Sequence, residues 1–293
     1  MTTGNTTTDS LADSLPTVIA SARIIREQEG VMPQVVDKVT LGKGTGLSWN
    51  EVSMAALTAQ AVTENTELDN PQQMSDTLFT ITPTVVGIQT LITDRVAARI
   101  SKNSYAKLGS LAQNAIQRKK DEDGLTVLDG ATTSLPGAGT ALSHGHIAAA
   151  VVRISSNTTE PGNPPYRAVL HGFQIKDVWD ELTASIGQTT TELTQGESAR
   201  AFREGFKGTI AGAQIFEDGN ITIDSGDDAK GGVFAQEGIV LVQGRAPRSE
   251  VKREPHIGGG ASSVYLYDEY AYGERSSGNW LYEIYSDATS PTS

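Results

Sequence analysis

The segment between residues 47 and 86 constrains this 293-residue chain most, because two alternating stretches there flank a polar one. Apolar residues alternate with polar ones at 47–50 and again at 79–85, where threonines separate the apolar side chains. A period of two predicts β-strands, and the polar residues 63–75 predict the tip of a long β-hairpin. A two-stranded ribbon has little core of its own, so we expect this one to need another surface.

The next segment predicts the longest helix of the chain. Apolar and small residues recur at helical spacing from Ile92 to Ala115. Thr90 or Thr93 can cap its start, and Gly124 can end it after the basic residues 118–120. From residue 92 to residue 120 such a helix is about 43 Å long, well beyond the average for a globular domain.

The rest of the sequence predicts an α+β fold in which helices and strands are mixed. Helices are expected at 16–29, 146–154, 175–186 and 199–206, and strands at 166–170, 209–216, 221–223, 233–243, 264–271 and 279–285. Glycine, threonine and proline make 125–140 a predicted linker. The sequence therefore predicts, in order, an arm, a hairpin, a long helix and a compact region of mixed helices and strands.

Composition excludes several classes of protein. Cysteine is absent, so neither disulfides nor thiolate zinc sites can form. No apolar run approaches the roughly 18 residues that a membrane helix needs, and residues 1–10 lack the pattern of a secretion signal. We therefore expect no membrane association and a cytoplasmic origin. The net charge of −12 argues against a protein that reads nucleic-acid sequence.

Charge is segregated along the chain. From residue 44 to residue 94 there is no Lys or Arg, and from residue 95 to residue 120 there is no Asp or Glu. The acidic residues of the first stretch are Glu51, Glu64, Glu67, Asp69, Asp76 and Asp94, and the basic ones of the second are Arg95, Arg99, Lys102, Lys107, Arg118, Lys119 and Lys120. We hypothesise that the acidic hairpin of one copy meets the basic surface of another. The alternative is that both faces are simply solvated.

Three apolar residues of the hairpin are candidates for the same contact. Trp49, Phe79 and Ile81 are too large for a lone ribbon to bury, and aromatic anchors are typical of interfaces. They can pack on a sister copy, or on the long helix of their own chain. The sequence leaves both alternatives open.

The sequence gives little support for an enzymatic function. His144 and His146 are spaced as two metal ligands on one strand edge, with Asp177 or Asp180 as a third in space, but they stand at a predicted helix start, where the two rings diverge. The chain has no Gly-x-Ser-x-Gly elbow and no phosphate-binding Gly-x-x-x-x-Gly-Lys. We therefore expect neither catalysis nor a bound metal or cofactor, and we keep a metal-dependent hydrolase as the distant alternative.

The order of these elements resembles one family, the major capsid proteins of tailed bacteriophages, whose fold is named after phage Hong Kong 97. The stretch 75–83 looks like the descending strand of that family's extended loop, 168–174 like its axial strand and helix, and 231–239 like its late axial strand. The resemblance covers nearly the whole chain. More specifically, the chain resembles capsid proteins of environmental, largely marine, tailed phages.

The resemblance implies a division of the chain. Residues 1–46 would be an N-terminal arm and 47–88 the extended β-hairpin loop. The peripheral domain with the long spine helix would take 89–140 and 245–293, and the axial domain 141–244.

The resemblance also implies partners. Copies of the chain would assemble as hexamers and pentamers into an icosahedral head shell, each extended loop lying over a neighbouring subunit. The shell would form in the host bacterial cytoplasm, become part of the virion and enclose double-stranded DNA without reading its sequence. A separate scaffolding protein, a portal and a decoration or cement protein are the other expected partners. The nearest alternative is a bacterial encapsulin nanocompartment shell with the same fold.

Some relatives crosslink through a Lys of the extended loop. The basic-free stretch 44–94 makes that route unavailable here.

Overall fold

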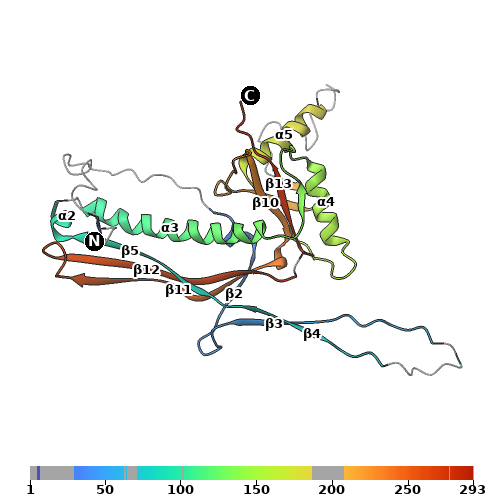
Figure 1. Cartoon of the computed structure of the whole chain (residues 1–293), viewed down its shortest axis with the longest axis horizontal. Helices are drawn as coiled ribbons and strands as arrows, with labels where there is room; N and C mark the ends of the chain where they lie inside the picture. Colours follow the sequence, from blue (N-terminus) through green and yellow to red (C-terminus); the bar gives the residue numbers. More distant parts are fainter. Residues whose placement is uncertain are drawn as a thin grey trace.

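The computed structural model describes residues 5–6, 30–62, 64, 71–99, 102–186, 208–276 and 278–292. They form two sheets, each covered by helices, and a two-stranded ribbon that projects away from both (Figure 1). The helices expected at 16–29 and 199–206 lie outside the described residues.

The first sheet is long and has five strands. Their order is β1 (Asn5–Thr6), β5 (Thr84–Thr93), β12 (Ala261–Glu274), β11 (Ile239–Glu254) and β2 (Asp37–Thr40). The three long strands β5, β12 and β11 are antiparallel, and β1 and β2 pair in parallel at the two edges. Tyrosine and β-branched residues, which suit a pleated surface, are frequent in β12 and β5.

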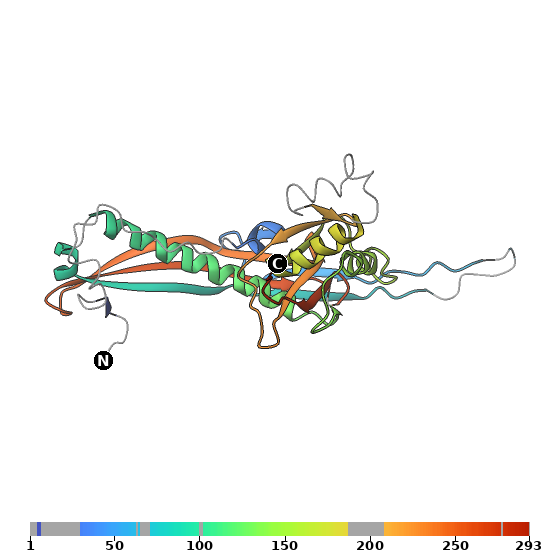
Figure 2. The ribbon, with the colours of Figure 1, turned by 90° about the horizontal axis from the view of Figure 1, so that it is seen from above.

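The long helix α3 (Lys102–Asp129) lies along this sheet, preceded by the short helix α2 (Asp94–Arg99) (Figures 1 and 2). The sequence places its start at Ile92, but that residue pairs with Ser262 in the sheet. The expected end at Gly124 is also wrong, because the helix continues to Asp129. Gly124 instead allows close packing, since a Cβ there would lie 2.8 Å from the Cβ of Met32.

The second sheet is compact and has six strands. Their order is β6 (Ser134–Pro136), β13 (Leu281–Asp287), β10 (Asp228–Ala235), β7 (Tyr166–Leu170), β9 (Ala213–Glu217) and β8 (Thr209–Ile210). Helices α4 (His144–Ser155) and α5 (Gly172–Ile186) belong to the same unit. Strands β7 and β10 are almost wholly buried, as expected for central strands of a sheet.

One of the core clusters contains residues from both sheets. The short helix α1 (Met32–Val35) contributes Met32, which packs in a cluster with Leu128 of α3 and Phe234 of β10. Leu281 of β13 and Tyr270 of β12 join the same cluster. Because residues from both sheets interlock there, the two units are fastened to each other by apolar burial.

Several strand boundaries differ from the expected ones. The stretch 209–216 forms two strands, β8 and β9, around a turn at Ala211–Gly212, and 221–223 supplies only a single bridge to Ala229. The stretch 233–243 is split by the 3-10 turn η2 (Gln236–Gly238), which sends the chain from the compact sheet to the long one. A continuous run of apolar residues does not reveal such a change of sheet.

The domain boundaries expected from the sequence also differ from the points at which the chain passes between the two sheets. Residues 245–293 are expected with the long helix, and β12 does lie there. Strand β13, however, pairs with β10 in the compact sheet, and β11 begins in the long sheet at Ile239, inside the range expected for the axial unit. The reason is geometric: the turn that follows β12 carries the chain across to the other sheet.

The ribbon is formed by β3 (Trp49–Met54) and β4 (Asp76–Ile81), paired antiparallel from Trp49 opposite Ile81 to Met54 opposite Asp76. This confirms the predicted hairpin strands. Figure 2 shows the ribbon extending past the compact unit, away from the long sheet. Its outer half therefore lies beyond the reach of the chain's own core.

Candidate functional site

The base of the ribbon is anchored on its own chain. Ile81 is only 5% exposed and packs with Val240 and Val242 of β11. Trp49 and Phe79 join the cluster with their rings edge to face, 6.0 Å between centroids. These three side chains thus pack on the long sheet of their own chain; a further contact with a sister copy stays a prediction.

A glycine makes this anchoring tight. A Cβ on Gly273 of β12 would lie 2.6 Å from the side chain of Ile81, so only glycine lets the ribbon approach so closely.

An ion-pair cluster fixes the same base. The Arg275 guanidinium donates to Glu51 at 2.6 Å and to Asp37 at 3.0 Å, and it lies over the Trp49 ring. Burial opposes its charge, but the hydrogen bonds to the two carboxylates outweigh burial and raise the pKa of Arg275. Glu51, a candidate contact for another copy, is therefore engaged within its own chain.

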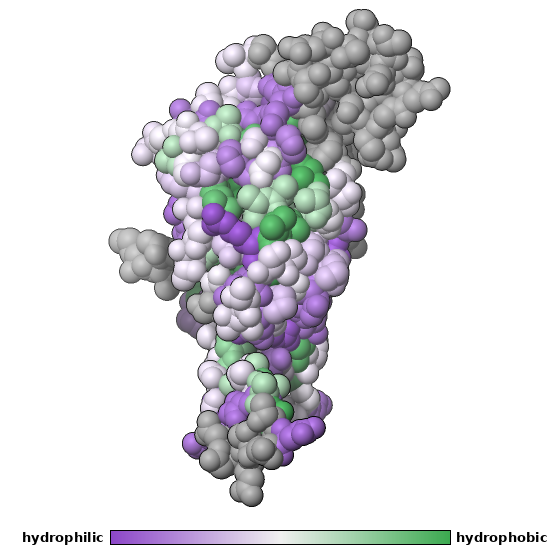
Figure 3. Space-filling view, turned by 90° about the vertical axis from the view of Figure 1, so that its right-hand side faces the viewer, coloured by the Kyte–Doolittle hydropathy of each residue, from purple (hydrophilic) through white to green (hydrophobic). Residues whose placement is uncertain are grey.

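Beyond its base the ribbon exposes apolar side chains. Val52 and Leu78 face each other across the two strands and are 51% and 62% exposed. Met54, Leu57 and Met74 continue this apolar surface outward. Figure 3 views the molecule from the end toward which the ribbon points, and green atoms lie on the narrow lower part as well as on the body. Such a row of exposed apolar residues marks an interaction surface.

The basic residues of the second stretch differ in their surroundings. Arg118 and Lys119 form ion pairs one turn along α3 with Glu122 and Asp123. Lys120 is turned inward and bonds the buried Asp268 of β12 at 3.2 Å. The side chains of Arg95 and Arg99 are exposed on α2, whereas those of Lys102 and Lys107 lie outside the described residues, as do Glu67 and Asp69. Glu64 is described and exposed.

These pairings weaken the idea of a basic surface along the whole helix. Three of the seven cations in the stretch 95–120 have carboxylate partners in the same chain. The acidic residues that provide most of these partners follow directly after residue 120, which is a signal that the sequence contains.

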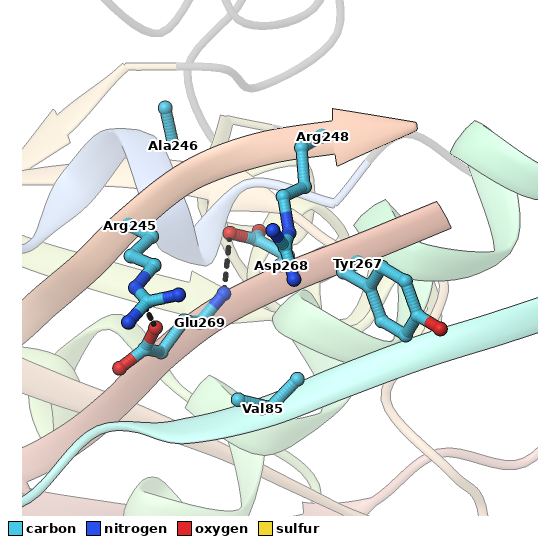
Figure 4. A pocket seen from close by; sticks show the side chains of 7 residues that line it. All are labelled: Val85, Arg245, Ala246, Arg248, Tyr267, Asp268 and Glu269. Atoms are coloured by element: carbon cyan, nitrogen blue, oxygen red, sulfur yellow. Dashed lines mark hydrogen bonds and ion pairs between the residues drawn. The ribbon is translucent and has the colours of Figure 1, made fainter. Parts of the chain in front are cut away.

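A pocket on the long sheet, which the sequence analysis missed, is lined by two arginines, by Asp268 and Glu269, and by apolar side chains. Val85 and Tyr267 line it together with Arg245 and Arg248 of β11 (Figure 4). Arg245 pairs with Glu269 at 3.3 Å, and Arg248 lies over the Tyr267 ring at 5.4 Å. The pocket arises where the register of β11 against β12 shifts at residues 243–248. The Gly-Arg-Ala-Pro-Arg sequence at 244–248 is the only local signal for such an irregularity.

The two candidate metal ligands diverge. His144 pairs with Glu181 through its Nδ1 at 3.0 Å, whereas the Nδ1 of His146 lies 3.0 Å from the hydroxyl of Ser143 in the N-terminal cap of α4. Among the described residues, no group of three or more His, Asp or Glu side chains is arranged to hold a metal ion. In the same part of the chain, no helix is long and apolar enough to cross a membrane.

The sequence itself matches no family model and no curated protein. The structure is nevertheless similar to known structures over almost its full length. A chain of Mycobacterium phage Che8 is 15% identical with a TM-score of 0.69, covering 92% of this chain and 97% of the other. The capsid of cyanophage P-SCSP1u gives 12% identity and a TM-score of 0.70, with 94% and 93% covered.

The head of Helicobacter pylori bacteriophage KHP40 gives 12% identity and a TM-score of 0.69, with 92% of this chain and 93% of the other covered. At such identities the similarity establishes the fold. The fold is the α+β capsid fold named after phage Hong Kong 97, as the order of elements predicts.

Proposed function

From the fold that it shares with these phage shells, we propose that this chain is the major capsid protein of a tailed bacteriophage. Many copies associate as hexamers and pentamers into the icosahedral head that encloses double-stranded DNA. The role is structural rather than catalytic. The observation that carries the proposal is the ribbon, which projects beyond its own core and exposes Val52, Leu78 and Met54.

Physical reasoning supports self-assembly. Apolar side chains that are exposed to water are unfavourable. Burying them against a neighbouring copy would stabilise the assembly by about 25 cal/mol for each Å² of apolar surface. In a closed symmetric shell every copy donates a ribbon and receives one, so modest contacts multiply into a stable particle. The long sheet with α3 would serve as the peripheral domain, and the compact sheet with α4 and α5 as the axial domain around which capsomers form.

The pocket at Arg245 and Arg248 is the receiving surface that we propose for the ribbon. It combines Val85 and Tyr267 with two arginines that are more than half exposed. Arg245 pairs with Glu269 and Arg248 with Glu250 in the same chain, and an acidic ribbon would replace these exposed ion pairs. The ribbon and its tip are acidic and carry no basic residue between 44 and 94. Charge complementarity of this kind selects partner and register more than it adds affinity.

The remaining partners follow from the same proposal. A separate scaffolding protein, a portal and a decoration or cement protein would act with the shell, and the DNA would be held without sequence-specific contacts. The closer likeness to marine phages also remains a prediction.

Electron microscopy of the overexpressed, purified protein tests the proposal. Polyhedral shells, tubes or isolated capsomers are the expected result. A compact monomer at high concentration, with the ribbon folded against its own body, would overturn it. The contents of the particles separate the two kinds of shell, because a nanocompartment holds a cargo protein in place of DNA.

A further inference from the structure

Two carboxylates are buried side by side where the two sheets meet. Asp121 lies on α3, which covers the long sheet, and Asp218 directly follows β9 of the compact sheet. Asp121 and Asp218 are both fully buried, with 0% of each residue exposed. Asn220 links them, since its side-chain amide donates to Asp121 Oδ2 at 2.9 Å and its backbone N–H to Asp218 Oδ1 at 2.9 Å.

A third segment is held by the same pair. The backbone N–H of Met32 donates to Asp121 Oδ1 at 2.9 Å, and that of Val31 to Asp218 Oδ2 at 3.4 Å. The backbone of Gly30 lies so close to Asp121 that a Cβ there would collide with the carboxyl group. The carboxylates thus fasten residues 30–32, which lead into α1, to both sheets at once.

In the described part of the chain, no cation compensates the pair. Among the described residues, no Lys, Arg or His forms an ion pair with either carboxylate, and the nearby Lys120 is engaged by Asp268. The titratable group that faces Asp121 from β12 is the phenol of Tyr272, whose buried hydroxyl has no hydrogen-bond partner in the described structure. Asp123 of α3 points to Tyr270 and not to the pair.

Two adjacent buried carboxyl groups do not both ionise readily, because each charge is stripped of water and repels the other. Burial, followed by the neighbouring Asp218, raises the pKa of Asp121 to about 7 in spite of the hydrogen bonds from Asn220 and Met32. Neither group is exposed, so no substrate can reach the pair. Its effect is therefore on the fold itself.

We propose that Asp121 and Asp218 share one proton and form a pH-sensitive latch that holds residues 30–32 against both sheets. With the proton present, one negative charge is spread over the pair and the four N–H donors satisfy its oxygens. Loss of the proton leaves two buried charges with no counter-ion. Residues 30–32 then separate first, because they are the smallest of the three segments held there.

The sign of the pH dependence follows from linkage. In the open state Asp121 regains water and an ordinary pKa of about 4, whereas in the closed state its pKa is raised to about 7. Opening therefore releases a proton between these values. The latch is tightest in acid, weakens as the pH rises, and changes no further above the pKa of the closed pair.

Amide hydrogen exchange of the full-length protein tests the latch. After correction for the intrinsic rate, the protection of the Val31 and Met32 amides is expected to fall about tenfold per pH unit from about pH 5 to 7. In Asp121→Asn the group whose pKa burial raises is replaced by a neutral one of similar shape, so the pH dependence should vanish. Asp76→Asn, an exposed carboxylate on the ribbon, should retain it. Equal protection at all pH values in the wild-type protein would overturn the latch.

A second measurement needs no variant. In the wild-type protein with carbon-13 in its aspartate carboxyls, one resonance should titrate near neutral pH, about three units above ordinary aspartates. Titration of every observable aspartate below about pH 5 would exclude a shared proton. Neither measurement depends on the formation of shells, so the latch and the capsid function can fail independently.

Discussion

Glu51 of the ribbon and Arg275, which directly follows β12, are joined by an ion pair of 2.6 Å. Arg275 also donates to Asp37 of β2 and to the backbone carbonyl of Glu237 in η2 at 2.7 Å. One guanidinium thereby connects the ribbon, the edge of the long sheet and the turn between the sheets. These contacts of Arg275 add to the packing of Ile81 and Phe79 in holding the base of the ribbon.

Replacing Arg275 by methionine should free the base of the ribbon. The variant keeps the stem of the side chain but leaves two carboxylates and the Glu237 carbonyl without their donor, at an expected cost of about 1–3 kcal/mol in unfolding free energy. Urea denaturation measures this cost. Arg248→Met, at an exposed ion pair with Glu250, is the control and should change stability by less than about 1 kcal/mol. Equal effects of the two variants would contradict the assignment.

Two glycines of α3 should respond oppositely to the same substitution. Gly124→Ala places a Cβ 2.8 Å from the Cβ of Met32, so overpacking should destabilise the protein by about 1–3 kcal/mol. A Cβ on Gly109 meets nothing within 4 Å, so Gly109→Ala should stabilise the helix by about 0.5–1 kcal/mol. Thermal or urea unfolding of both variants gives the sign. A stabilising Gly124→Ala would show that α1 does not pack there.

The exposed apolar pair of the ribbon should matter for assembly and not for folding. In Val52→Ser/Leu78→Ser the unfolding free energy of the unassembled protein should stay within about 0.5 kcal/mol, because both side chains are mostly exposed. The fraction of protein in particles, measured by sedimentation, should fall sharply. Thr77→Ala, on the other face of β4, is the matched control. Normal particles from the double serine variant would refute the role of the ribbon.

The charge hypothesis predicts a reciprocal rescue. Reversing Glu64, Glu67 and Asp69 to lysine should slow assembly, most clearly at low ionic strength. Reversing Arg245 and Arg248 to glutamate should do the same, and combining the two sets should restore much of the rate if the tip meets the pocket. Light scattering during assembly measures the rates. Normal shells from the lysine variant would show that both faces are merely solvated.

The local pattern of apolar and polar residues predicted those strands and helices whose burial follows one pattern along their whole length. The alternation around Trp49 and Phe79 predicts β3 and β4, and the apolar run at 166–170 predicts β7 to the residue. The boundaries of α3 were beyond local pattern. Ile92 fits a helical period and also a strand, and Gly124 is a signal for a helix end unless another segment packs against it.

The candidate contacts were predicted only in part. Charge counts along the sequence identify an acidic ribbon, but they do not tell which cations are already paired. Lys120 finds Asp268, 148 residues away, and Glu51 finds Arg275, 224 residues away. Such pairs depend on which strands become neighbours, and no local spacing encodes that.

The sequence alone determined the order of the elements, the hairpin without a core and the acidic character of its tip, because periodicity and composition act within a few residues of each position. The tertiary structure decided what lies far apart in sequence but close in space: the split of 233–243 between two sheets, the pocket at Arg245 and the meeting of Asp121 with Asp218. The physical reason is that burial and charge compensation are properties of neighbours in space, which only the folded chain brings together.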